Sequence, residues 1–264
     1  MDKQKPIGIF DSGLGGLSIA HAVKSILPEE DVVYVADIEY SPYGCKSKQV
    51  IADRSERILK FLIEQGCKLI VVACNTATVN SIGLLRSQCS IPIVGVEPGI
   101  KPAAMQSETG VVGVLATEQT LKSDSFRQLK ACYTSKVRIE ERACPEFVSI
   151  VESLEHEEQA ATVTAERYIR PLLDEGCDKI ILGCTHFSFL KPAISKVVED
   201  KADIIDTAEA VAKEVQRRLN HSNLRNENDT QGSIKFWTTG TSENTAVSVG
   251  KLWQQEVSVF QANP

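Results

Sequence analysis

The segment Glu64–Cys74, EQGCKLIVVAC, returns in similar form as DEGCDKIILGC at Asp174–Cys184 and reveals a duplication within the chain. The cysteines that end these two segments lie 110 residues apart. A second pair of segments, GIFDS at 8–12 and GVLAT at 113–117, repeats at nearly the same spacing. Self-similarity at a fixed offset indicates repeated structural units. The chain is therefore predicted to consist of two similar halves.

Short, apolar, β-rich runs alternate with longer stretches of helical apolar spacing, the pattern of parallel sheets covered by crossover helices. The predicted strands are 6–10, 31–36, 68–73, 91–96, 111–116, 136–141, 179–183, 203–206 and 234–238, and the predicted helices are 17–26, 48–65, 77–88, 120–129, 160–175, 189–198 and 207–218. We expect an α/β protein of two doubly wound domains related by a pseudo-twofold axis. The first comprises residues 1–97 and 207–264, the second 98–206, and the active site lies in the cleft between them.

Composition narrows the possible partners. Of the 264 residues, 42% are hydrophobic and 24% charged, which is typical of a globular chain with a real core. The formal net charge of −6 argues against a general nucleic-acid or anionic-membrane surface, since both need clustered Lys and Arg. The start of the chain lacks the features of a secretory signal, and no apolar run approaches the roughly 18 residues of a membrane span. We expect a cytoplasmic protein that binds a small molecule.

Two of the eight cysteines stand apart from the others. Cys74 and Cys184 each follow a predicted buried strand and precede a polar pair and a helix. Ligands of parallel α/β sheets bind at the carboxyl ends of strands, where helix N-termini favour anions. If the halves face each other, the two thiols lie on opposite walls of one cleft. The remaining cysteines, at 45, 67, 89, 132, 144 and 177, form no Cys-x-x-Cys or zinc-spaced cluster and are predicted to be packing residues.

Two opposed thiols suit a reaction that inverts an α-carbon. Such a reaction removes a proton from one face and delivers one to the other, so a proton-transfer group must flank each face. A thiol, with an ordinary pKa of about 8.5, can serve in either protonation state. The developing carbanion needs electrostatic stabilisation, which backbone N–H groups and polar side chains could supply. The candidates are Ser12, Asn75, Thr76 and Thr185.

Five local signatures accompany the two cysteines. They are GIFDSGLGGL at 8–17, Ala36-Asp37 followed by Pro42-Tyr43-Gly44, Cys74-Asn75-Thr76-Ala77, Val151-Glu152, and Gly183-Cys184-Thr185-His186. In this order and around matched cysteines they resemble the glutamate racemase family over nearly the whole chain. The resemblance implies interconversion of L- and D-glutamate without pyridoxal phosphate or metal, supplying D-glutamate for peptidoglycan and hence for cell-wall biogenesis and cell shape. It also implies a homodimer.

Roles carried over from the resemblance attach to particular residues. Cys74 and Cys184 would be the acid/base catalysts, with Asp11 assisting Cys74, and His186, paired with Glu152, assisting Cys184. Related aspartate racemases carry an acid after the second Cys-Thr, so His186 favours glutamate. The substrate-binding set implied by the resemblance is Asp11, Ser12, Asp37, Tyr43, Gly44, Asn75, Thr76, Thr185 and His186, with Asp37 orienting groups nearby.

Two departures from the family pattern are visible. Ser149 stands where proline is common, which bears on the backbone near Glu152, and the polar stretch 222–232 is expected to be a longer loop. The run Glu155–Glu158 is predicted to be an exposed helix face, and His21, His156 and His221 to be structural or solvated.

Other functions stay open at this level. The glycines at 13, 15 and 16 resemble a dinucleotide loop, but Ser18 occupies the place of the third glycine. A binding protein that closes on a small dicarboxylate would leave the paired thiols unexplained, and a thiol redox protein would be expected to carry Cys-x-x-Cys. Within the enzyme class, racemisation of aspartate or another acidic amino acid is the main competitor.

Overall fold

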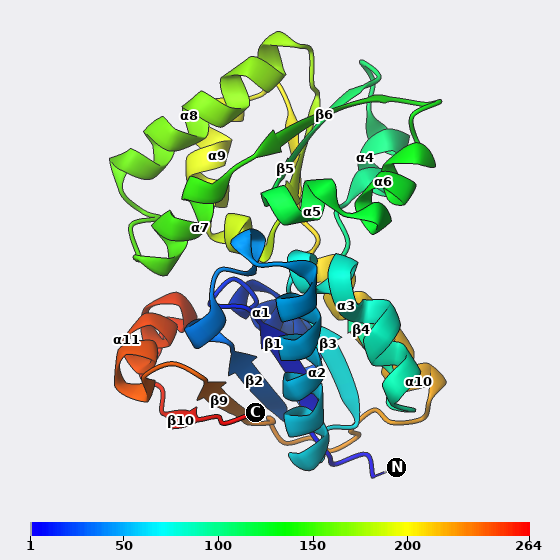
Figure 1. Cartoon of the computed structure of the whole chain (residues 1–264), viewed down its shortest axis with the longest axis vertical. Helices are drawn as coiled ribbons and strands as arrows, with labels where there is room; N and C mark the ends of the chain where they lie inside the picture. The colour runs from blue at the N-terminus through cyan, green and yellow to red at the C-terminus, as the bar shows by residue number, and fades with distance from the viewer. Residues whose placement is uncertain (1) are drawn as a thin grey trace.

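The computed structural model describes residues 2–264 and contains two parallel sheets, each with helices on both faces (Figure 1). The first sheet has the order β10-β9-β2-β1-β3-β4 and the second β6-β5-β7-β8. All neighbouring strands are parallel. The strands are β1 Ile7–Asp11, β2 Val32–Ala36, β3 Leu69–Val72, β4 Ile93–Gly95, β5 Val111–Ala116, β6 Arg138–Ala143, β7 Lys179–Gly183, β8 Asp203–Ile205, β9 Ile234–Thr238 and β10 Val259–Gln261. The predicted α/β class of two doubly wound, similar halves is confirmed.

Helices cover both faces of each sheet because the central strands are apolar on both sides. Alternate side chains of β1 and β3 enter two separate cores, one shared with α1, α10 and α11 and the other with α2 and α3. In the second sheet, α7, α8 and α9 cover one face, and α4 and α6 the other. The helices are α1 Leu17–Ile26, α2 Lys48–Glu64, α3 Asn75–Gln88, α4 Ile100–Gln106, α5 Glu118–Lys122, α6 Asp124–Ala131, α7 Pro145–Glu152, α8 Gln159–Asp174, α9 Lys191–Val198, α10 Ala208–His221 and α11 Ser242–Trp253, with 3-10 turns at 38–40, 43–45 and 185–190.

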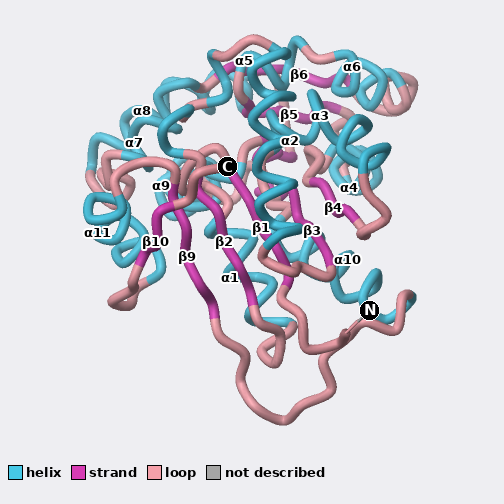
Figure 2. Tube along the Cα trace, turned by 60° about the horizontal axis from the view of Figure 1, so that its bottom comes forward, coloured by secondary structure: helices cyan, strands magenta, loops and turns pink. Residues whose placement is uncertain are grey.

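Strand register places the repeated motifs at corresponding edges. Phe10 pairs with Val72, so that the residues following β1 and β3 emerge together at the carboxyl edge of the first sheet. Ala116 pairs with Gly183 in the second sheet, which brings Thr117 and Cys184 to the equivalent edge. The two carboxyl edges face each other, and the chain passes between the units after β4 and again after β8 (Figures 1 and 2).

Several local predictions need correction. The single helix expected over 120–129 is two helices, because extended Ser123 ends α5 and its hydroxyl caps α6 by accepting the Phe126 N–H. Residues 155–158 form a turn between α7 and α8 and not a helix face. Four elements were not anticipated: α4 and β10, which are short, α7, and α11, whose serines, threonines and glycine dilute its helical pattern.

The two departures from the family pattern have structural answers. Ser149 lies inside α7, where its carbonyl accepts the N–H and hydroxyl of Ser153, and the helix continues unbroken to Glu152. The polar loop at 222–232 is anchored to Glu30, whose carboxylate accepts the Asn226 N–H and pairs with the buried ammonium of Lys68. Neither feature disturbs the facing edges.

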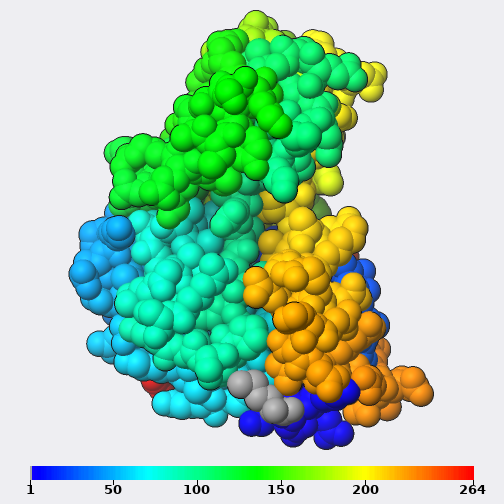
Figure 3. Space-filling model, turned by 90° about the vertical axis from the view of Figure 1, so that its right-hand side faces the viewer, coloured from blue at the N-terminus to red at the C-terminus, as the bar shows by residue number. Residues whose placement is uncertain are grey.

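The units are in contact along their facing edges. In the space-filling view the upper unit rests directly on the part of the lower unit formed by α3 (Figure 3). Among residues 2–264, every helix is too short or too polar to cross a membrane.

Candidate active site

Cys74 lies at the junction between β3 and α3. Its sulfur caps the helix by accepting the Ala77 N–H at 3.4 Å, and it lies 3.6 Å from the hydroxyl of Ser12, which follows β1. The residue is 5% exposed. Burial, with the nearby carboxylate of Asp11, raises the pKa of the Cys74 thiol to about 12. In this buried position Cys74 is therefore a neutral thiol at neutral pH.

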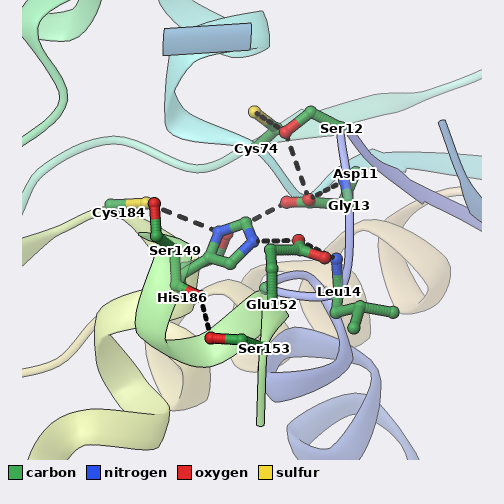
Figure 4. Close-up of polar contacts among 12 residues, drawn as sticks. Asp11, Ser12, Gly13, Leu14, Cys74, Ser149, Glu152, Ser153, Cys184 and His186 are labelled. Atoms are coloured by element: carbon green, nitrogen blue, oxygen red, sulfur yellow. Dashed lines mark hydrogen bonds and ion pairs between the residues drawn. The ribbon is translucent and has the colours of Figure 1, made fainter. Parts of the chain in front are cut away.

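Cys184 occupies the equivalent junction after β7, at the start of the 3-10 turn. Its sulfur lies 3.7 Å from Nδ1 of His186, whose Nε2 is 2.6 Å from Oε1 of Glu152 at the end of α7. Figure 4 shows the imidazole between the sulfur and the carboxylate. Cys184 is 7% exposed, so this wall is also closed to solvent. The geometry is a linear sulfur–imidazole–carboxylate chain.

The imidazole in this chain is held in its charged form. Burial opposes a charge on His186, but hydrogen bonding to Cys184 and Glu152 outweighs it and raises the pKa of His186 well above its ordinary value. Burial likewise opposes ionisation of Glu152, yet the His186 contact and the Leu14 N–H lower the pKa of that carboxyl. The pair is thus an imidazolium and a carboxylate at neutral pH, which places a positive charge beside the Cys184 sulfur.

The glycine-rich segment after β1 joins the two units. The Leu14 N–H donates to Glu152 Oε1 at 2.9 Å, and the Thr185 hydroxyl donates to Asp11 Oδ2 at 3.0 Å. A Cβ atom on Gly13 would lie 2.1 Å from Glu152 Oε1, and one on Gly15 would lie 2.3 Å from His186 Nδ1. These glycines permit a close approach between the two units. This requirement accounts for the glycine-rich run that resembles a dinucleotide-binding loop in the sequence.

Asp11 has a central position in this contact. Its Oδ1 accepts the Gly13 N–H at 2.6 Å, while Oδ2 binds Thr185 of the opposite unit. Burial raises the pKa of Asp11 and is only partly offset by the charge of His186. Asp11 can therefore exchange a proton more readily than an exposed carboxylate.

Three threonine hydroxyls form a second polar cluster between the units. Thr76 Oγ1, in the first turn of α3, is 2.9 Å from Thr117 Oγ1 and 3.3 Å from Thr120 Oγ1 in the opposite unit. Thr117 is the repeat counterpart of Ser12, a sequence signal that could have identified it. Asn75 Oδ1 is buried and, among residues 2–264, has no hydrogen-bond partner, so it is a free acceptor at the site.

Asp37 lies farther from the thiols. Its carboxylate binds Arg54 through two contacts, of 2.8 and 3.1 Å, and accepts the hydroxyls of Tyr43 at 2.5 Å and Thr239 at 2.9 Å. These bonds favour the orienting role suggested for Asp37. Arg54 and Thr239 were missed because nothing local in the sequence joins them to Asp37.

The structure thus gathers most of the predicted residues into one buried cluster between the units. Hydrogen bonds link Cys74, Ser12, Asp11 and Thr185 in one series and Cys184, His186 and Glu152 in another, and Asn75 and Thr76 extend the Cys74 wall. Tyr43 is buried in the same core as Cys74, and Gly44 approaches Thr117. Both thiols are therefore closed to solvent in this arrangement of the units.

Comparisons of sequence and fold relate the chain to known proteins. A family model described as Asp/Glu/hydantoin racemase matches residues 17–215. The chain is 46% identical to a glutamate racemase of Herpetosiphon aurantiacus, over 90% of this chain and 94% of the relative. A crystal structure of a glutamate racemase isoform from Bacillus anthracis superposes with a TM-score of 0.91 at 30% identity, covering 99% of this chain and 98% of that one.

A further solved relative was captured with its ligands. Escherichia coli glutamate racemase in complex with L-glutamate and the activator UDP-MurNAc-Ala has a TM-score of 0.85 at 31% identity, covering 97% of both chains. The chain therefore belongs to the glutamate racemases, amino-acid isomerases of the Asp/Glu/hydantoin racemase family.

Proposed function

We propose that the protein interconverts L- and D-glutamate by a two-base mechanism in which Cys74 and Cys184 act on opposite faces of the α-carbon, without pyridoxal phosphate or metal. The observation that carries this proposal is that the repeated cysteines lie in one buried cluster between the facing edges, linked through Thr185 and Asp11. Solved relatives hold L-glutamate or D-glutamate, which supports the choice of substrate.

The proposed reaction in one direction begins with the proton on Cys74. Cys74 carries its proton, since burial and Asp11 disfavour a second negative charge there. On the other wall, His186 supplies the positive charge that compensates the Cys184 sulfur once its proton is lost. Cys184 then removes the α-proton of one enantiomer and Cys74 delivers its proton to the opposite face. The reverse reaction begins from the opposite protonation states, with Asp11 assisting proton exchange at Cys74.

Polar groups around the cleft stabilise the negative charge that develops on the substrate. The N-terminus of α3 presents free N–H groups close to Cys74, and the turn after Cys184 does the same on the other wall. The hydroxyls of Ser12, Thr76 and Thr185 add further donors. The unpartnered Asn75 Oδ1 is suited to accept a hydrogen bond from the substrate ammonium.

The division into residues 1–97 with 207–264 and 98–206 is proposed as a pair of domains that open and close about the two crossing segments. Because the catalytic groups are buried when closed, closure would exclude water during proton transfer. A glutamate-bound structure with an open, wet cleft would contradict this. The wider role proposed is supply of D-glutamate for peptidoglycan in the cytoplasm, by a homodimer that binds neither nucleic acid nor membrane.

The first test follows the α-proton directly. Protein freed of pyridoxal phosphate and metals is incubated in D2O with L-glutamate or L-aspartate, and exchange is followed by NMR alongside chiral chromatography. Deuterium at Cα together with D-glutamate, while aspartate stays inert, is the expected result. Exchange with aspartate alone would indicate an aspartate racemase. No exchange with either acid, despite a folded protein with free thiols, would favour a binding protein.

A further inference from the structure

A buried ionic cluster behind the Cys74 wall joins three distant parts of the first unit. Asp37, at the end of β2, has no exposed surface, and its carboxylate receives Arg54 from α2, Tyr43 from the following loop and Thr239 from the end of β9. The guanidinium of Arg54 also lies 3.9 Å from the ring centroid of Tyr40. We propose that Arg54 is a positioning residue that sets substrate affinity by fixing, through Asp37, the loop that carries Tyr43 and Gly44.

The loop that carries Tyr43 and Gly44 contacts both units. Tyr43 packs in the core that contains Cys74, and Gly44 approaches the side chain of Thr117 in the opposite unit. The Lys46 carbonyl accepts a hydrogen bond of 2.5 Å from the Gln119 side chain, also in the opposite unit. A loop that touches the thiol wall and the facing unit must hold one conformation for the closed site to form.

The cluster is suited to impose that conformation. Arg54 contacts both oxygens of Asp37, a fork-like geometry that a lysine ammonium cannot reproduce. The same carboxylate accepts the Tyr43 hydroxyl at 2.5 Å. Burial and the Asp37 carboxylate raise the pKa of Tyr43, so the phenol keeps the proton it donates. Arg54 thereby fixes Tyr43 through the Asp37 carboxylate that both side chains bind.

The test compares kinetic constants for glutamate racemisation, so the inference rests on the proposed function. Arg54→Met and Tyr43→Phe are each expected to raise KM about tenfold while kcat changes less than about threefold, because pre-organisation is lost and the thiols are untouched. Arg54→Lys should recover part of the affinity. The matched control is Arg57→Met, an exposed arginine on the same helix, which should leave both constants unchanged.

A double-mutant cycle tests whether Arg54 acts through Tyr43. If it does, Arg54→Met combined with Tyr43→Phe raises KM no further than either change alone. Multiplied effects on KM, or an unchanged KM in folded Arg54→Met, would overturn the inference while leaving a racemising wild type intact. A wild type that does not racemise glutamate would instead overturn the proposed function.

Stability is controlled separately. Removing Arg54 leaves the buried Asp37 carboxylate without its cation, which destabilises a folded chain. Arg54→Met with Asp37→Asn removes both charges and keeps a hydrogen-bonding group next to Tyr43. This pair should unfold close to the wild-type temperature and still show the raised KM. Wild-type affinity in this pair would also overturn the inference.

Discussion

Replacing Gly15 with alanine is expected to disable catalysis by preventing closure of the cleft. The added Cβ would lie 2.3 Å from Nδ1 of His186 and 2.6 Å from the His186 backbone nitrogen. Ordinary van der Waals contact begins at 3.4 Å, so the backbone contact alone is about 0.8 Å too short. A side-chain rotation cannot relieve a backbone clash, and the two units must separate.

Separation of the two units would move Cys74 and Cys184 away from the positions needed for proton transfer. A displacement of about 1 Å costs on the order of a hundredfold in rate when proton donors and acceptors must be aligned. We therefore expect kcat of Gly15→Ala to fall about a hundredfold. The midpoint of thermal unfolding should stay close to that of the wild type, because the clash exists only when the cleft is closed. Racemisation is followed by circular dichroism with either enantiomer as substrate.

The matched control is Gly83→Ala. Gly83 lies on the exposed side of α3, where an added Cβ would meet nothing within 4 Å. Alanine there should keep full activity and stabilise the helix by about 0.5–1 kcal/mol. Wild-type kcat and KM in Gly15→Ala would refute the conclusion that this glycine is required for close approach of the units.

Two further predictions concern the acid/base groups. In Cys74→Ser and Cys184→Ser the substituted residue becomes the slow proton donor or acceptor. The primary isotope effect of deuterium at the substrate Cα should therefore rise for one enantiomer in the first variant and for the other enantiomer in the second. Equal isotope effects for both enantiomers would contradict the two-base assignment. Isotope effects are the measurement of choice because an equilibrium constant of one forces kcat/KM to be equal in both directions. Glu152→Gln removes a carboxylate that raises the pKa of His186, so the imidazolium should lose its proton at lower pH. The alkaline limb of the pH profile of kcat/KM should then shift to lower pH. An alkaline limb at the wild-type pH would show that His186 does not control it.

The fold class and the catalytic candidates could be predicted from local patterns in the sequence. Buried parallel strands leave continuous apolar runs, and the duplicated segment around Cys74 and Cys184 shows which strand ends correspond. Strands at 111–116, 179–183 and 234–238 and the helix at 17–26 were predicted with their observed bounds. Weak local patterns were less informative, as in α11 and the split between α5 and α6.

The contacts between these residues became visible only in the folded chain. The Leu14 contact to Glu152, the Thr185 contact to Asp11 and the Arg54–Asp37 ion pair join residues between 17 and 174 positions apart in the chain. Their charges and pKa values depend on burial and on neighbours that no local pattern specifies. The glycines at 13 and 15 illustrate the difference, since their requirement is imposed by side chains of the opposite unit across the closed cleft.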